Sequence, residues 1–537
     1  MPEVHAEIRG AFWCVAALFA VFLALPMLFL FRESLGGAEG VFAHYAVLAE
    51  SPSFQTSLGN SFLVSGLAAL ITTVLAFFLA YTLHNTGLPG ALKKFIANMT
   101  LAPMFLPTIT YGFVLIYAFG REGLITRLLG FQPVEIYGMN GLLAGYVVYT
   151  LPIAFLLINN TFKYVDKNFA VVSKIMGDTP IRTFLVTAVR PLTGTLGAAF
   201  IQAFTLCFTD FGIPASIGGQ FDVVAIHLYN EMLGSIPNFA GGAAIATVML
   251  LPSAASIALV SWLERYNFRY SKISQTETQK NPWRDALCGA FSLVLIFLIV
   301  AVFAVMFVVP FVRNWPYDTS FTFANWGRLL GSPNLLGIIG RTLLVAFLSA
   351  LGGTVAAYAA AIIAARSSMG NAAQALMNGI AVVTNAVPGM VLGIAYVFAF
   401  SGTCLRNTFA VLILCNIVHL FTTPYLMAKG SLEKMNRGWE STAALMGDSW
   451  WKTLVRVLIP NSLPSILDMF GYYFINSMIT ISAVIFLVGA HTGVLTTKIK
   501  ELQHFAKFDE IFVMSLLILL TNIAMRFALS RAAKKRG

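Results

Sequence analysis

Charged residues are scarce in this sequence. Only 11% of its 537 residues are Asp, Glu, Lys or Arg, whereas 58% are hydrophobic. A water-soluble domain of ordinary composition carries about 25% charged residues. So much apolar surface cannot be hidden inside one water-soluble core. The composition therefore excludes an ordinary soluble enzyme or binding module and indicates a protein dissolved in lipid.

Cysteine and histidine are also too sparse and too scattered to build a site. None of the five cysteines forms a C-x-x-C pair, and the seven histidines show no spacing typical of metal ligands. We interpret the cysteines as small apolar packing residues. The sequence therefore predicts no disulfide framework, no metal site, no cofactor and no catalytic residues.

Long apolar stretches take up most of the chain. A membrane span needs roughly 20 predominantly apolar residues, and a lone segment in lipid must satisfy its own backbone hydrogen bonds as a helix. We therefore expect an all-α polytopic membrane protein. Its twelve predicted transmembrane helices cover 11–31, 58–83, 98–119, 140–160, 192–213, 240–262, 286–311, 335–365, 376–400, 408–428, 463–488 and 509–530.

The net charge of +11 could suggest nucleic-acid binding, but the distribution of the charge argues against it. If the N-terminus lies inside, most Lys and Arg residues fall on cytoplasmic segments. Such an excess is the positive-inside bias of membrane proteins. We therefore expect both termini in the cytoplasm, and no nucleic-acid partner.

One short polar segment occurs twice. "MGDTPIRTFLVTAVRP" begins at Met176 and "MGDSWWKTLVRVLIP" at Met446, a difference of 270 positions (446 − 176). Other segments pair similarly, such as "LPTITYGFVLIYAF" at Leu106 with "VPGMVLGIAYVFAF" at Val387. The chain is therefore expected to contain two homologous halves of six spans each, which would be parallel repeats. The halves are 1–264 and 286–537, joined by a cytoplasmic linker at 265–285.

The repeated segment lies in a long cytoplasmic loop of each half, 161–191 and 429–462. Residues 166–176 and 436–446 have helical character, and a glycine follows each at a position suited to a left-handed helix end. Thr179 and Ser449 are good N-caps for a second short helix. We expect Pro191 and Pro460 to end that helix before the next span. Each loop would then form a rigid knob with exposed apolar residues, namely Phe184, Trp450, Trp451 and Leu454.

Here the chain resembles the permease subunits of type I, binding-protein-dependent ABC importers. Their cytoplasmic loop reads roughly E-A-A-x-x-x-G, followed at a distance by Leu-Pro. The second copy, "ESTAALMGDSWWKTLVRVLIPNSLPSI", matches from Ala443 onwards, although Ser441 and Thr442 replace the Glu and Ala. The first copy lacks the Glu, and its Pro191 lies one residue further from the glycine. The resemblance covers essentially the whole chain.

The resemblance implies that each loop carries a coupling helix that docks on a cytoplasmic ATPase. No G-x-x-x-x-G-K-[ST] phosphate loop occurs in this chain, so a separate subunit must hydrolyse ATP. The implied partners are two ATPase copies and an extracytoplasmic binding protein, with the chain as a multi-pass protein of the bacterial inner membrane. The implied coupling residues are Gly177, Asp178, Thr179, Pro180, Arg182, Phe184, Gly447, Asp448, Ser449, Trp450, Trp451, Lys452, Leu454 and Pro460.

The stretches that follow the loops suggest a cargo. "FTDFGIPASIGGQFDVVAIHLYNEM" at Phe208 and "SAVIFL" at Ser482 are similar to fused permeases of 2-aminoethylphosphonate and ferric-iron importers. We expect phosphonate as cargo, with ferric iron as the alternative. Polyamine, thiamine or another small solute remain further possibilities.

Four polar residues near the ends of the fifth and eleventh spans could line the passage: Asp210, Asn476, Thr480 and Ser482. The simpler interpretation is solvation of a helix end for Asp210 and hydrogen bonding between helices for the others. An ion-coupled secondary transporter is a rival, with Asp468 as the candidate carboxylate, but it leaves the repeated loop unexplained. A membrane enzyme would need clustered His, Asp or Glu.

Overall fold

The computed structural model describes residues 6–36, 40–166, 168–263, 281–367 and 369–534. Within these ranges the chain is almost entirely helical, and the only strands form one short antiparallel hairpin, β1 (Val312–Asn314) with β2 (Asp318–Phe321). The predicted all-α class is confirmed. Most of the predicted linker lies outside the described residues, and its last four residues, from Pro282, already belong to a helix.

Two compact units make up the chain. One comprises Met1–Ala49, Leu228–Leu250 and Trp326–Gly537, and the other Glu50–His227 and Leu251–Asn325. The first unit contains α1 (Ala6–Phe19), α2 (Leu25–Leu35), α3 (Ala43–Glu50), α16 (Ala324–Leu330), α17 (Pro333–Arg366), α18 (Asn371–Ala386), α19 (Gly389–Phe400), α20 (Phe409–His419), α21 (Thr422–Glu433), α22 (Gly438–Leu445), α23 (Trp450–Thr453), α24 (Ile459–Ile479), α25 (Leu495–His504) and α26 (Phe508–Lys534). The second contains α4 (Pro52–Asn85), α5 (Gly90–Leu101), α6 (Thr108–Phe119), α7 (Leu124–Leu129), α8 (Met139–Phe162), α9 (Asn168–Ile175), α10 (Pro180–Phe184), α11 (Thr193–Thr209), α12 (Gly212–Ile217) and α15 (Pro282–Val308), while α13 (Val224–Leu233) and α14 (Phe239–Leu263) extend across the division.

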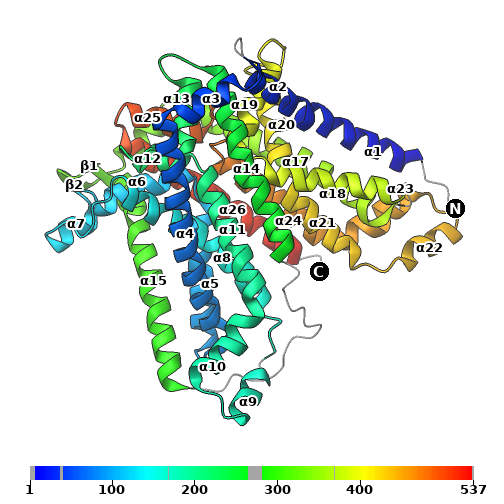
Figure 1. The fold of residues 1–537 in the computed structure, drawn as a ribbon, viewed down its shortest axis with the longest axis horizontal. Coiled ribbons are helices and arrows are strands. Elements are labelled where there is room, and N and C mark those ends of the chain that lie inside the picture. Colours follow the sequence, from blue (N-terminus) through cyan, green and yellow to red (C-terminus); the bar gives the residue numbers. More distant parts are fainter. Residues whose placement is uncertain (1–5, 37–39, 167, 264–280, 368, 535–537) are drawn as a thin grey trace. The chain divides into compact units, whose positions relative to one another are not determined.

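The compact units do not coincide with the two sequence halves, because the first span of each half packs on helices of the other. Helices α1 and α2 contact α17 and α19 of the second half, and α15 contacts α4, α5 and α6 of the first (Figure 1). The halves are defined by sequence similarity, whereas the compact units are defined by which helices pack together, so the two divisions of the chain need not agree. The boundaries at 264 and 286 stay a prediction about the repeat.

Membrane-spanning helices are fewer than the twelve expected if only unbroken ones are counted. Eight described helices are long and apolar enough to span, and up to eleven do if three bent pairs are each taken as one span. The eleventh predicted span, 463–488, is not among these candidates; it corresponds to α24, which ends at Ile479. In the eight helices, at most 56% of the most apolar window is buried inside the protein. The rest is an apolar surface suited to lipid.

Two of the bent pairs occupy matching places in the two halves. The helices bend by 109° before α6 and by 103° before α19, where Pro107 and Pro388 precede the second member of each pair. Proline has no backbone N–H and disfavours a helical conformation for the residue before it. The third and ninth spans are therefore pairs of half-helices, which hydropathy alone did not reveal.

Hydrogen bonds repeat as well as helices. The Ser61 hydroxyl on α4 accepts from the Val224 amide at the start of α13 (2.8 Å), and the Thr342 hydroxyl on α17 accepts from the Leu495 amide at the start of α25 (2.9 Å). Each hydroxyl satisfies an amide that lacks a partner inside its own helix. The two halves therefore share atomic detail, not only an order of spans.

Glycine permits close approach at the half-helices. Gly212 at the start of α12 lies against Thr108 at the start of α6, without room for a Cβ atom. In the second half the small and hydroxyl residues are exchanged, since Gly389 begins α19 and a Cβ there would lie 2.8 Å from the Ser482 Oγ. In each half a glycine therefore packs against a hydroxyl residue, but the glycine and the hydroxyl residue have changed places between the halves.

Candidate functional site

The first repeated loop, 161–191, is a helix, a sharp turn and a second helix. Helix α9 ends at Ile175, and Gly177 follows with φ +76°, a conformation that other residues adopt only at a cost. The Thr179 side chain then caps α10 by accepting a hydrogen bond from the Arg182 amide (3.3 Å), with Pro180 in the first helical position. The predicted turn and cap are confirmed.

The second loop repeats this geometry. Helix α22 ends at Leu445, Gly447 has φ +75°, and the Ser449 side chain accepts from the Lys452 amide (3.3 Å) at the start of α23. Both N-caps have nearly the same backbone conformation, with φ and ψ of −64° and 154° in the first loop and −65° and 152° in the second. The repeat therefore specifies one backbone shape.

An acidic residue after each glycine closes the turn. The Asp178 amide donates to the Ser173 carbonyl (3.1 Å), and its carboxylate pairs with the Arg182 Nε (3.0 Å). In the second loop Asp448 pairs with Lys452 in the same i, i+4 relation. Each carboxylate lies just before the N-cap of the second helix, where negative charge interacts favourably with the positive end of the helix dipole. The charge pattern therefore supports both knobs.

Pro191 and Pro460 do not end the second helix, and that prediction was wrong. Each short helix passes through a π-helical turn, at Leu185–Val189 and Leu454–Leu458, and continues into the next span. In π-helical and 3₁₀ turns the backbone amides bond to different carbonyls than in an α-helix. A proline, which has no N–H to donate, therefore fits there without ending the helix. The one-residue difference between the copies falls before these turns, because α10 has five residues and α23 four.

Three matched positions carry the exposed apolar side chains of the knobs. In the first loop these are Ile175, Met176 and Ile181, which are 80%, 76% and 74% exposed. Their counterparts 270 positions later are Leu445, Met446 and Trp451, which are 89%, 76% and 59% exposed. We define these six residues as the knob surface. Exposed apolar residues at a rigid, repeated place favour a protein partner.

Of the four residues expected on the exposed surface, Trp451 alone is exposed. Trp450 is half-buried, and the other two pack against the protein. Leu454 is 6% exposed. Phe184 packs edge-on against Tyr81 and Phe77 of α4, with ring centroids 5.4 and 5.9 Å apart. The sequence reveals that both are apolar but not which face of a four- or five-residue helix they occupy. The four apolar residues before the glycines were overlooked, although their repetition was visible.

The first loop is anchored by aromatic packing and hydroxyl groups. Besides the Phe184 contacts, the buried Ser173 hydroxyl donates to the Asp178 carboxylate (2.7 Å) and lies 2.9 Å from the Thr183 hydroxyl. These bonds tie α9 to α10 directly. The loop is therefore held by local polar contacts and by one aromatic side chain inserted beside α4.

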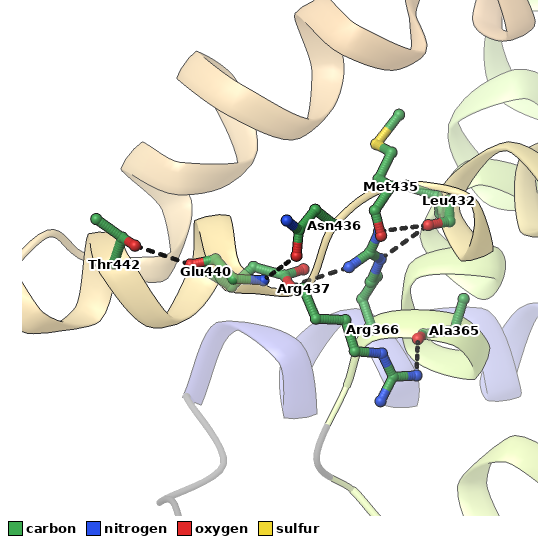
Figure 2. A network of polar contacts seen from close by, with 9 residues as sticks. Ala365, Arg366, Leu432, Met435, Asn436, Arg437, Glu440 and Thr442 are labelled. Atoms are coloured by element: carbon green, nitrogen blue, oxygen red, sulfur yellow. Dashed lines mark hydrogen bonds and ion pairs between the residues drawn. The ribbon is translucent and has the colours of Figure 1, made fainter.

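The second loop is anchored by a buried arginine that the sequence did not indicate. Figure 2 shows Arg366, at the end of α17, surrounded by the chain that leads into α22. Its guanidinium donates to the Leu432 and Met435 carbonyls, the latter at 2.7 Å, and to the Glu440 carboxylate at 3.1 Å. Arg437 reaches back to the Ala365 carbonyl (3.1 Å).

The Arg366 side chain is 1% exposed and that of Glu440 22%. Burial raises the pKa of the Glu440 carboxyl, and the nearby Arg366 and Arg437 oppose this shift. Among the described residues, the second carboxylate oxygen of Glu440 has no hydrogen-bond partner. A buried charge of this kind is costly without its partner. Arg366 therefore fixes the second loop to the end of α17.

The four proposed pathway residues are not gathered in one place within either unit. Asp210 belongs to the second unit, where it is buried and accepts from the Ile213 amide (2.8 Å). Asn476 and Thr480 lie in the first unit and hydrogen-bond to carbonyls of their own helix (2.8 and 2.7 Å). Of the four, Ser482 alone makes no hydrogen bond among the described residues.

Among the described residues no group of three or more His, Cys, Asp or Glu side chains could hold a metal ion.

Two regions of the chain, 73–268 and 353–535, match the family model described as binding-protein-dependent transport system inner membrane component. The chain belongs to this family. It is therefore the permease component of a type I ABC importer, with one copy of the family domain in each half. The fused form also agrees with its relatives.

Two relatives span nearly the whole chain. The putative ferric transport system permease protein FbpB 1 of Haemophilus influenzae is 24% identical over 90% of this chain and 78% of its own length. The ferric transport system permease protein FbpB of Actinobacillus pleuropneumoniae is 24% identical over 93% and 74%. A spermidine/putrescine transport system permease protein PotC homolog of Mycoplasma genitalium is 25% identical over 41% of this chain and 73% of its own length.

Proposed function

We propose that this permease imports ferric iron, delivered by an extracytoplasmic binding protein and driven by a pair of ATPase subunits docked on its two cytoplasmic loops. The observation that carries the proposal is the knob surface, three exposed apolar positions repeated 270 residues apart on the same backbone turn. A partner that binds both loops must present the same pocket twice, as two identical ATPase subunits would.

The cargo is proposed from the relatives. The two relatives described above that span nearly the whole chain are named as ferric transport permeases, one of them as putative. The expectation of 2-aminoethylphosphonate rests on short stretches such as "SAVIFL", whereas the relatives that span the chain favour the ferric-iron alternative, so iron replaces phosphonate as the leading cargo. The proposed orientation places the loops and both termini in the cytoplasm, and Asp210, Asn476, Thr480 and Ser482 near the solute path.

Uptake distinguishes the cargoes. Cells that produce this chain with its ATPase and binding protein are given radiolabelled ferric iron or radiolabelled 2-aminoethylphosphonate in parallel. The proposal expects iron accumulation that requires the chain and stops when Gly447 is replaced by proline, with the variant still inserted in the membrane. Accumulation of phosphonate but not iron would replace the cargo, and accumulation of neither would reject the importer.

A further inference from the structure

The two halves differ at the place where the half-helices begin. In the first half the Asp210 carboxylate lies there, where it accepts from the Ile213 amide (2.8 Å) and from the Thr108 hydroxyl. The matching end of α24 in the second half is Thr480, which carries no charge. An anion that is built into the first half is therefore missing from the second.

Hydrogen-bond donors occupy the corresponding place in the second half. The point where a Cβ of Gly389 would lie is 2.8 Å from the Ser482 Oγ and 3.0 Å from the His419 Nε2. His419 thus faces the start of α19, a twelve-residue helix whose N-terminus favours negative charge. Its other ring nitrogen, Nδ1, is buried and has no partner among the described residues.

Asn416 lies one turn before His419 on the same face of α20. Its side chain is 1% exposed, and neither the amide nitrogen nor the amide oxygen has a partner among the described residues. A buried amide without partners is costly, and such groups are rare in folded proteins. The face of α20 beside α19 therefore holds unsatisfied hydrogen-bonding capacity.

The first half lacks these donors. Its "YTLP" at Tyr149 aligns with "FTTP" at Phe421, which places Val147 opposite His419 and Ala144 opposite Asn416. The helix also differs, because α8 continues without a break through this region, whereas α20 and α21 meet at a bend of 53°. The donors are therefore specific to the second half.

A buried lysine lies on the helix that is attached to the segment carrying Ser482. The Thr496 hydroxyl donates to the Thr480 carbonyl (3.1 Å), which attaches α25 to the segment that carries Ser482. Lys500, one turn further along α25, is 9% exposed, and its ammonium donates to the Gln503 Oε1 (2.9 Å). The ammonium lies 6.0 Å from the centre of the ring of Tyr229, which is the matching residue of the first half because it follows Val224 as Lys500 follows Leu495. That ring lies 6.3 Å from Phe486, which packs beside Gly393 of α19.

We propose that Lys500, Ser482, His419, Asn416 and the N-terminus of α19 bind an oxyanion as the solute passes through the second half. The inference rests on the proposed function and names the chemistry of the passing solute. These groups offer hydrogen-bond donors and a cation but no carboxylate, so they suit the anionic part of the solute rather than a bare ferric ion, which prefers anionic oxygen ligands. The oxyanion is either a phosphonate or the anionic ligand that accompanies ferric iron.

The test is ligand-dependent thermal stability of the full chain in lipid nanodiscs. The probes are 2-aminoethylphosphonate, inorganic phosphate, citrate alone and citrate with ferric iron. At least one probe should raise the unfolding temperature saturably. The variants His419→Val and Lys500→Tyr install the first-half residues and should raise the half-saturating concentration roughly tenfold or more.

The matched control is Lys498→Tyr on the same helix, because Lys498 pairs with Glu501 instead. It should bind the probe as the unaltered chain does. The inference is overturned if no probe at millimolar concentration stabilises the unaltered chain, or if Lys498→Tyr weakens binding as much as Lys500→Tyr. A phosphonate response assigns a free oxyanion, and a response to ferric citrate alone assigns the iron complex. Iron uptake without any oxyanion response rejects this inference and leaves the proposed function intact.

Discussion

The two repeated loops have the same exposed shape but different anchors. Gly177 and Gly447 differ by one degree in φ, and both loops present apolar residues at the same three positions. The contacts that hold the loops differ. Phe184 packs against α4 in the first loop, and Arg366 pairs with Glu440 in the second. We infer that a common partner constrains the surface it contacts, whereas each half can hold that surface by any contacts that are stable.

The largest expected effect comes from the feature that the loops share. Replacing Gly177 or Gly447 with valine places a β-branched residue at positive φ, which costs about 1–3 kcal/mol and disfavours the turn. Either variant should lose iron uptake and the ATPase subunit on purification. The control is Gly430→Val, since Gly430 lies in α21 with open space around its Cβ position. Normal uptake by both loop variants would remove these turns from the coupling mechanism.

Arg366→Met should affect the second loop alone. Removing one partner of a buried ion pair costs about 3–5 kcal/mol, because Glu440 would stay buried and uncompensated. Hydrogen exchange should therefore speed up over α22 and stay unchanged over α9. The double variant Arg366→Met/Glu440→Gln should recover part of the loss. Equal changes in both loops would show that the anchors are not separate.

Phe184→Ala is the reciprocal change. The side chain is only partly buried against α4, so its removal should cost about 2 kcal/mol, less than the loss of a fully buried aromatic. Exchange should rise over α9 and α10 and remain slow over α22. A result in which Phe184→Ala loosens the second loop would contradict independent anchoring.

The smallest effect concerns the second half's lysine. Burial lowers the pKa of Lys500 to about 8, so its ammonium is charged at pH 7 and largely neutral at pH 9. Its matched residue, Tyr229, stays uncharged because burial raises its pKa. Binding of inorganic phosphate should therefore weaken from pH 7 to pH 9, although phosphate gains negative charge over that range. Unchanged or stronger binding at pH 9 would exclude the ammonium from the site.

The sequence predicted what is repeated and missed what is specific to one half. Glycine and capping residues determine the conformation of the backbone next to them, so the turns and caps that they form can be predicted from the local sequence. Arg366 and Glu440 are 74 positions apart and meet only after α17 and α22 have packed. The bends before α6 and α19 were missed because hydropathy counts apolar residues without regard to proline. The outward face of α10 and α23 was misjudged because helices so short show no periodicity.

We propose that the two knob surfaces share one mode of docking, in which each binds one of two identical ATPase subunits. The most direct measurement is cross-linking from single cysteines at position 181 or 451, in a chain whose five native cysteines are replaced by serine. Shared docking predicts a chain–ATPase adduct from each position and none from the exposed control at position 128, which lies in α7. An adduct from only one loop, or from neither, would contradict it.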